Sequence, residues 1–251
     1  MTIKSDYTAA ELTAAAQRRL ERWLLSPELQ THMQRAEDVQ KKRTETGPYI
    51  AISREAGSRG TEIAYEVGRQ LGWDVLDKEL LDFMAERYKL PRDMLDVVDE
   101  ARANWFHDVL GVFLDAQVVS QDRYVAHLER IVHLAALHGN VVFVGRAAQY
   151  MLPRHCGLAV RIMAPRQRRV DNLMSRRIID RSKAEQLLDD LDAARVDFCR
   201  RHFHRNALDP LEYDLVINTA RVPIEAAAEM IVAAFGRIVR SGAGASGTRA
   251  K

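Results

Sequence analysis

Short apolar runs of strand length alternate with segments of helical spacing over most of the chain. Near-continuous apolar strands separated by helices are typical of a parallel sheet that is covered on both faces. The pattern therefore predicts an α/β protein, and its strands are expected at residues 49–53, 73–77, 141–145, 158–164 and 214–218, of which the second run is the weakest.

The first 47 residues carry a helical pattern and no strand-like run. Leu12 and Ala16 recur at helical spacing, and Pro27 is expected to begin a second helix that the pair Gly47-Pro48 ends. We interpret residues 1–47 as an N-terminal helical extension. It is expected to pack on the domain or on another subunit, which makes a homodimer through these helices one possible assembly.

Two further segments depart from the strand–helix alternation. The interval 78–138 is almost wholly helical in pattern, and Trp105, Val109 and Phe113 fall on one face of the expected helix. Core packing is the simplest explanation of that stripe. The last residues, 241–251, are rich in Gly, Ala and Ser and have no apolar pattern, which predicts a disordered tail.

Composition narrows the class of protein. Of the 251 residues, 47% are apolar and 29% are charged, which is ordinary for a chain with a real core. A formal charge of +2 is too small to indicate nucleic acid as the main partner. Two cysteines, no apolar leader segment and no run of membrane-spanning length predict a cytoplasmic protein without disulfides and without a membrane partner.

A turn containing Gly57, Ser58, Arg59 and Gly60 joins the first strand to a helical pattern. Backbone N–H groups at a helix N-terminus bind phosphate, and glycine permits the close approach that this requires. In the P-loop pattern G-x-x-x-x-G-K-[ST], placing Thr61 at the Ser/Thr puts Gly60 at the lysine position. Shifting the register by one puts Arg59 there, but in neither register does a glycine stand at either glycine position of the pattern. The turn alone therefore leaves a phosphate loop and a plain tight turn open.

Gly145 and Arg146 stand at the end of the apolar run 141–145. Ligands of open α/β sheets bind at the carboxyl ends of the strands, and the planar arginine fork suits phosphate. The pair therefore indicates an anion site. The alternative is an arginine that pairs with a surface carboxylate.

Arginines are dense from residue 166 to residue 206. Within this stretch, Asp192 and Arg195 share a helix face at i, i+3 spacing. Such a segment suits a lid that closes on transferring phosphates. A solvated basic helix face is the alternative for individual arginines, and nucleic-acid binding is disfavoured because no recognised motif accompanies them. Cys199, His202 and His204 do not share one helix face, so a zinc site is rejected.

Four segments in order resemble the cytidylate kinase-like proteins, a branch of the P-loop nucleoside monophosphate kinases. The first resembles the family's opening Ile-Ser-Arg-Glu-x-Gly-Ser-Gly-Gly signature, and the last resembles its closing Tyr-Asp-Leu-Val-Ile-Asn-Thr strand. The segments are "AISREAGSRGTEIA" (51–64), "LGWDVLDKELL" (71–81), "VFVGRAAQYML" (142–152) and "DPLEYDLVINTARVPIEAAAEMI" (209–231). The resemblance covers residues 48–240.

The resemblance implies a three-layer α/β/α P-loop kinase-like fold with a helical monophosphate-binding insertion within 78–138 and a lid near 176–206. It implies transfer of the ATP γ-phosphoryl group to a nucleoside monophosphate such as CMP, with Mg²⁺. Three sets of site residues follow, all carried over from the family except Arg59 and Arg201, which come from the glycine turn and the arginine-dense segment of this chain. They are Gly57, Ser58, Gly60 and Thr61 for ATP, with Thr61 near Mg²⁺; Asp77, Arg146 and Arg201 for the monophosphate; and Arg59, Arg146, Asp192 and Arg195 for catalysis.

The chain departs from the P-loop pattern or from the family at four positions. Gly60 stands at the P-loop lysine, a loss that the wider family shares, and Arg59 replaces a family glycine and is the candidate for the missing charge. Ala147 stands where true cytidylate kinases carry Asp, and Leu188 stands where their first lid arginine lies. Three hypotheses follow: a cytidylate-type kinase, a nucleotide-binding regulatory protein with weak or no kinase activity, and a kinase for another small phosphorylated acceptor.

Overall fold

The computed structural model describes residues 8–24, 46–87 and 121–245. The chain divides into two compact units. One comprises Met1–Gly47 with Glu79–Gly139, and the other comprises Pro48–Lys78 with Asn140–Lys251. The expected second helix from Pro27 and the apolar stripe at Trp105 lie outside the described residues.

The described secondary structure of the first unit is entirely helical. Its helices are α1 (Ala9–Leu24), α4 (Lys78–Arg87, which begins one residue before the unit) and α6 (Gln121–His138). Helices α1 and α6 contact each other, and Trp23 of α1 is buried. The Tyr124 hydroxyl on α6 donates a hydrogen bond of 2.6 Å to the Asp82 carboxylate on α4.

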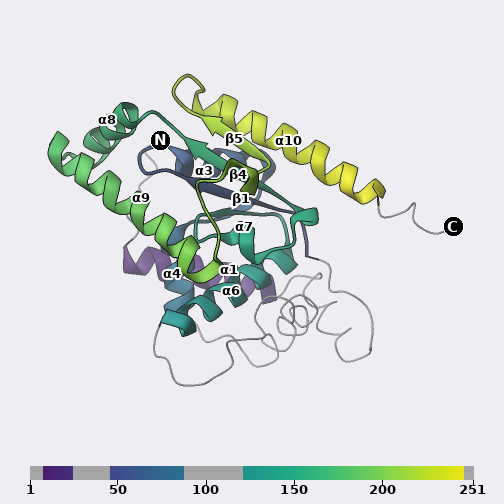
Figure 1. Cartoon of the computed structure of the whole chain (residues 1–251). Helices are drawn as coiled ribbons and strands as arrows, with labels where there is room; N and C mark the ends of the chain where they lie inside the picture. Colours follow the sequence, from purple (N-terminus) through teal and green to yellow (C-terminus); the bar gives the residue numbers. More distant parts are fainter. Residues whose placement is uncertain (1–7, 25–45, 88–120, 246–251) are drawn as a thin grey trace, which may run out of the picture. The chain divides into compact units, whose positions relative to one another are not determined.

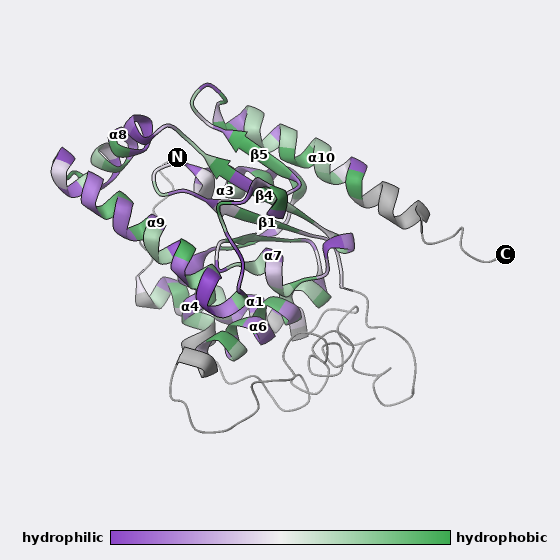
Figure 2. Cartoon of the chain, in the orientation of Figure 1, coloured by the Kyte–Doolittle hydropathy of each residue, from purple (hydrophilic) through white to green (hydrophobic). Residues whose placement is uncertain are grey.

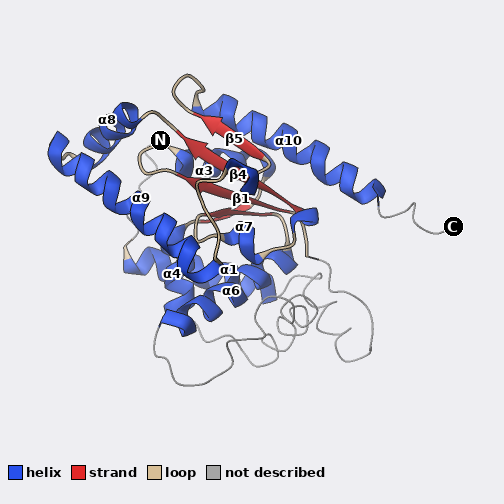
Figure 3. Ribbon diagram, viewed as in Figure 1, coloured by secondary structure: helices blue, strands red, loops and turns tan. Residues whose placement is uncertain are grey.

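The second unit is built on a parallel five-stranded sheet with the order β2-β3-β1-β4-β5 (Figure 3). The strands are β1 (Tyr49–Arg54), β2 (Asp74–Leu76), β3 (Val141–Val144), β4 (Gly157–Met163) and β5 (Leu215–Asn218). All five apolar runs form strands, so the predicted α/β class with a parallel sheet is confirmed. The ends of the strands differ from the predicted runs by at most one residue.

Helices follow the strands of this unit in sequence order (Figure 1). They are α3 (Gly60–Leu71), α7 (Ala148–Met151), α8 (Arg166–Arg177), α9 (Arg181–Phe203) and α10 (Ile224–Ala245), with short 3-10 turns at Arg154–Cys156 and Pro210–Glu212. Helix α10 includes the first five residues of the 241–251 tail, and the remaining tail residues lie outside the described part. In the described part of the chain, no helix combines the length and apolar character that a membrane span requires.

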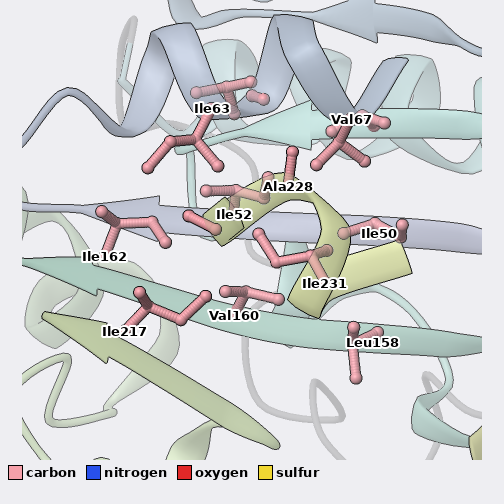
Figure 4. Packing of buried hydrophobic residues seen from close by; sticks show 14 of the residues in the cluster. Ile50, Ile52, Ile63, Val67, Leu158, Val160, Ile162, Ile217, Ala228 and Ile231 are labelled. Carbon is pink, nitrogen blue, oxygen red and sulfur yellow. The ribbon is translucent and has the colours of Figure 1, made fainter. Parts of the chain in front are cut away.

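Helices α3 and α10 cover one face of the sheet (Figure 4). Ile50 and Ile52 of β1 point into this cluster and meet Ile63 of α3 and Ile231 of α10. The alternate β1 residue Ala51 faces the opposite side and is also buried. Hydrophobic residues accordingly fill the strands and much of α10, whereas α8 and α9 are rich in hydrophilic ones (Figure 2). Burial on both faces explains why the strands read as continuous apolar runs.

Helices α8 and α9 are joined by the turn 178–180 and pack against each other. Their shared core holds Val170, Leu173 and Leu188, and it includes Ala56 from the turn after β1. The C-terminal part of α9 contributes Cys199 to a second small cluster, which it forms with Ala147 and Ala207. This helix pair therefore lies directly on the glycine turn and on the residues that follow β3.

Candidate functional site

The glycine turn packs tightly between β1, α3 and α8. Gly57 has a φ of +73°, and a Cβ there would lie 2.3 Å from the backbone oxygen of Arg169. Arg59 has a φ of +64° and is the N-cap of α3, without a side-chain capping bond. Ser58 is fully buried, and its Oγ donates to the Glu55 oxygen at 2.9 Å. Gly57 is thus required by the close approach of α8 as well as by its own backbone conformation.

The backbone N–H groups of the turn fall into two sets. The Ala56 N–H donates to the Asp192 carboxylate at 2.8 Å, and the Ser58 N–H donates to the backbone oxygen of Glu55 at 3.3 Å. Those of Gly60, Thr61 and Glu62, in the first turn of α3, have no hydrogen-bond partner in the described part of the chain. Such orphan donors at the positive end of a helix fit a phosphate group.

Asp192 of α9 reaches the turn with its carboxylate. Oδ1 accepts from the Ala56 N–H and, at 3.1 Å, from Nη1 of Arg195, while Oδ2 pairs with Nη1 of Arg169. The bond between Arg195 and Asp192 confirms the shared helix face that their i, i+3 spacing predicts. Arg169 is largely buried, and its Nε lies 3.4 Å from the Glu55 carboxylate. One N–H group and two guanidinium groups therefore surround the Asp192 carboxylate.

A pocket with a volume of about 150 Å³ opens beside this carboxylate, at the carboxyl ends of β1 and β3. Its apolar lining includes Leu191 and Phe198 of α9, and its anionic lining consists of Glu55 and Asp192. The cationic lining side chains are Arg54, Lys78, Arg146, Arg161 and Arg195. Five cations against two anions give the lining a formal charge of +3, which suits an anionic ligand.

The residues after β3 adopt an unusual conformation. Gly145, Arg146 and Ala147 have φ values of +80°, +52° and +57°. Two consecutive non-glycine residues in the left-handed region cost about 1–2 kcal/mol each, and such strain clusters at functional sites. The turn brings the Arg146 guanidinium carbon to 5.1 Å from the centroid of the Phe198 ring, a cation–π contact between this turn and α9.

Arg161 on β4 fixes the floor of the pocket. Its Nη1 donates to the Ala207 oxygen at 2.6 Å, and its Nη2 lies 3.4 Å from the Glu55 carboxylate. The other Glu55 oxygen accepts from the Ala164 N–H at 3.2 Å. Glu55 is therefore held by two arginines and a backbone amide. It serves as the junction between the glycine turn, β4 and α8.

Cys199 lines the same pocket from α9. Burial raises the pKa of its thiol to about 11, so the thiol is protonated and weakly nucleophilic at neutral pH. Among the described residues no group of three or more His, Cys, Asp or Glu side chains is arranged to hold a metal ion. Oxygen is the ligand atom that Mg²⁺ prefers, and the hydroxyl of Thr61 in the first turn of α3 would be a protein oxygen suited to hold it.

The structure brings part of the predicted site together. Arg146, Asp192 and Arg195 line the pocket, and Gly57, Ser58, Gly60 and Thr61 form the adjoining turn and helix start. The other three predicted residues have different surroundings. Arg59 lies 3.7 Å from Glu62 and is half exposed; Asp77 is buried and accepts a 2.6 Å bond from the Tyr65 hydroxyl; Arg201 is exposed and pairs with Asp197.

Several pocket or turn residues were not predicted from the sequence, and they include Arg54, Lys78, Arg169 and Phe198. For Arg54 and Lys78 the signal was present, because both follow closely on predicted strands, as Arg146 does. Arg169 was one arginine among many in its segment. Phe198 carried no signal, because its role depends on where α9 crosses the turn after β3.

This geometry defines a class: a parallel α/β protein with unpaired backbone N–H groups at the N-terminus of α3 and a cationic pocket at the adjacent strand ends. Residues 49–221 match the model of the Cytidylate kinase-like family, and the chain belongs to that family. No curated protein sequence gives a significant match.

Solved structures resemble the chain at low sequence identity. An uncharacterized protein from Eubacterium ventriosum is 20% identical, with a TM-score of 0.57 over 75% of this chain and 98% of its own. Shikimate kinase from Acinetobacter baumannii is 17% identical, with a TM-score of 0.41 over 75% of this chain and 92% of its own. Dephospho-CoA kinase from Campylobacter jejuni is 14% identical, with a TM-score of 0.34 over 76% and 98%. The first of these supports the fold.

Proposed function

We propose that the protein is a nucleotide kinase of cytidylate-kinase type, which transfers the γ-phosphoryl group of ATP to a (deoxy)nucleoside monophosphate such as CMP. The observation that carries the proposal is that Arg54, which lines the cationic pocket, packs against Gly60, where the orphan N–H groups of α3 begin. Two anionic groups held at these two positions would be neighbours. Phosphoryl transfer consists largely of such positioning and of charge stabilisation.

Each part of the site has a role in this proposal. The N–H groups from Gly60 to Glu62 hold the phosphates of ATP, and the Thr61 hydroxyl supplies a protein oxygen to Mg²⁺. The cation neutralises charge on the phosphate oxygens when it is bound. Arg146 and Arg195 orient the monophosphate, one of whose oxygens forms a bond to the γ-phosphorus as the bond to ADP breaks and ADP leaves with the electron pair.

The charge of the missing P-loop lysine must come from elsewhere. Gly60 occupies its place, and Arg59 is engaged with Glu62, which also lies 3.3 Å from Arg176. Arg59 would therefore have to leave Glu62 to reach a γ-phosphate. Arg169 and Arg195 already flank the Asp192 carboxylate that accepts from the Ala56 N–H, and they are the better-placed source of positive charge.

A second candidate function is a nucleotide-binding regulatory protein with weak or no kinase activity. Two observations favour it: Gly60 stands at the lysine position, and the Asp192 carboxylate already occupies the Ala56 N–H. Dimer formation through the N-terminal helices and a cytoplasmic location stay predictions under either function.

A coupled ADP-release assay tests the proposal. The purified protein is mixed with ATP, Mg²⁺ and each nucleoside monophosphate in turn, and then with small non-nucleotide phosphates. Turnover with CMP or another monophosphate supports the kinase, and turnover with a non-nucleotide acceptor alone replaces the substrate class. Tight binding of MgATP without turnover selects the regulatory protein. Absence of both binding and turnover refutes nucleotide recognition altogether.

A further inference from the structure

The Asp192 carboxylate has the surroundings that a bound phosphoryl group would have. It accepts from a backbone N–H of the glycine turn and is flanked by Arg169 and Arg195. Charge-assisted bonds of this kind, from backbone amides and arginine forks, are how proteins hold phosphate oxygens. Here an aspartate of the chain itself makes them.

The position of Asp192 adds to this likeness. Its side chain is 26% exposed and lines the cationic pocket, so the carboxylate lies between the glycine turn and the pocket. Under the proposed function, the γ-phosphoryl group passes between the same two places. A phosphoryl group and the Asp192 carboxylate cannot both accept from the Ala56 N–H, because the two anions would then lie in contact.

We propose that Asp192 is a displaceable internal anion: it fills the phosphoryl position of the turn in the free protein and must leave it when a polyphosphate binds. The inference rests on the proposed function, since it concerns regulation of the same site. Its consequence is that the free protein holds α9 on the turn and binds phosphates more weakly than its arginines alone would allow.

The arginines need not move far to exchange one anion for the other. Arg169 is kept in place by its contacts with the Glu55 carboxylate and, at 3.4 Å, with the Ala56 oxygen. Arg195 lies one turn from Asp192 on the same helix. When Asp192 withdraws, the Arg169 guanidinium remains beside the turn, because Glu55 and the Ala56 oxygen hold it there, and it becomes available to the incoming phosphate. Exchange of anions couples phosphate binding to the position of α9.

The test compares three full-length proteins: wild type, Asp192→Asn and the matched control Asp189→Asn. Asp189 lies on the same helix and pairs with Arg166 at the surface, so its replacement makes the same change in charge away from the turn. The affinities for inorganic tripolyphosphate and for MgATP are measured by titration calorimetry at fixed ionic strength. Circular dichroism establishes that the variants are folded.

We expect Asp192→Asn to bind tripolyphosphate roughly tenfold or more tightly than wild type, because a charge-assisted bond no longer competes, and Asp189→Asn to bind as wild type does. Equal or weaker binding by Asp192→Asn, with MgATP binding by wild type intact, overturns the internal anion and leaves the nucleotide site standing. If none of the three binds MgATP or tripolyphosphate, the proposed function fails and the inference fails with it.

A measurement on the unaltered protein guards against a variant that does not fold. The carboxyl carbon resonance of Asp192 is followed by nuclear magnetic resonance as tripolyphosphate is added, and Asp189 again serves as the reference. A shift of the Asp192 signal that saturates with binding supports displacement. Saturable binding that leaves the Asp192 signal in place contradicts it.

Discussion

The Arg54 guanidinium lies directly against the Cα of Gly145: a Cβ at Gly145 would come within 1.8 Å of Nη1 of Arg54. The contact joins the end of β1 to the strained turn after β3, at the wall of the cationic pocket. The atom that a new methyl group would meet is the far end of a flexible side chain. A substitution at Gly145 therefore moves Arg54 and leaves the backbone of β1 in place.

Gly145→Ala tests this contact against the matched control Gly72→Ala. Gly72 has a similar φ of +68°, and its Cβ would meet nothing within 4 Å. Both variants should lose about 1 kcal/mol of unfolding free energy, because alanine is strained at positive φ. Only Gly145→Ala should also weaken binding to the pocket, because Arg54 is displaced. Urea denaturation and phosphate titration measure the two effects, and equal phosphate affinity in both variants would contradict the role of Arg54.

Gly57→Ala is expected to be more damaging. A Cβ at Gly57 would lie 2.3 Å from the backbone oxygen of Arg169, which cannot swing aside as a side chain does. Backbone strain and overpacking together should cost roughly 2–4 kcal/mol. In urea denaturation the midpoint should fall well below that of Gly72→Ala. A loss no greater than that of the control would show that α8 moves freely away from the turn.

Arg146→Ala should reduce kcat/KM by roughly 10²–10³, because one charge that stabilises the transferring group is removed. Its stability should change little, since the strained turn keeps a non-glycine residue. Arg200→Ala is the control, because Arg200 lies on α9, is exposed and pairs with Asp197. Steady-state kinetics with the best acceptor from the ADP-release screen decide the matter. Unchanged turnover in Arg146→Ala would remove Arg146 from the site.

The turn between α8 and α9 carries an avoidable strain. Ile178 has a φ of +53° and is 93% exposed, so a β-branched residue takes the left-handed position that usually belongs to glycine. Ile178→Gly should raise the free energy of unfolding by about 0.5–1 kcal/mol, after allowance for the greater entropy of glycine in the unfolded chain. Its neighbour Ile179 packs on the core of the helix pair, and Ile179→Gly should destabilise. Thermal melting compares the two variants, and a lower melting temperature for Ile178→Gly would contradict the strain.

Features of the fold that arise from neighbouring residues in the sequence could be predicted, whereas features that arise from contacts between distant residues could not. The five strands were predictable because burial on both faces leaves a continuous apolar run, as in Val141–Val144. The boundaries of the strands were less predictable. Strand β4 begins at Gly157, where a Cβ would lie 2.1 Å from the Tyr49 ring. That contact depends on the pairing of β4 with β1, which lies 108 residues earlier in the chain. Helix ends and strand ends are set by such tertiary contacts.

The residues of the site divide in the same way, into those placed by local sequence and those placed by tertiary contacts. Arg146 was predictable because a strand end is a local feature, and the same reasoning extends to Arg54 and Lys78. The contact between Asp192 and Ala56 joins residues 136 positions apart, and no spacing in the sequence encodes it. Arg201 lies in the arginine-dense segment that the sequence analysis singled out, and in the structure it pairs with Asp197 on its own helix.

Cys199 offers a chemical measure of how closed the pocket is. Burial raises the pKa of its thiol to about 11, and the thiolate is the form that reacts with alkylating reagents. At pH 8 the thiolate fraction is then on the order of 10⁻³, so native Cys199 should react with iodoacetamide roughly a hundredfold more slowly than in urea. Mass spectrometry of the separated peptides distinguishes Cys199 from the partly exposed Cys156, and equal rates in native and unfolded protein would show that the pocket is open to solvent.

The raised pKa of the Cys199 thiol makes the free energy of unfolding fall as the pH rises. A thiol whose pKa is raised by folding keeps its proton in the native state at a pH where the unfolded chain has lost it. Its contribution is therefore complete below the unfolded pKa near 9 and is lost as the pH rises through about 11. Cys199→Ala should remove this part of the decline in unfolding free energy between pH 9 and pH 11, as measured by urea denaturation. A decline of the same size in both proteins would mean that the thiol titrates normally, and that α9 does not seal this side of the pocket.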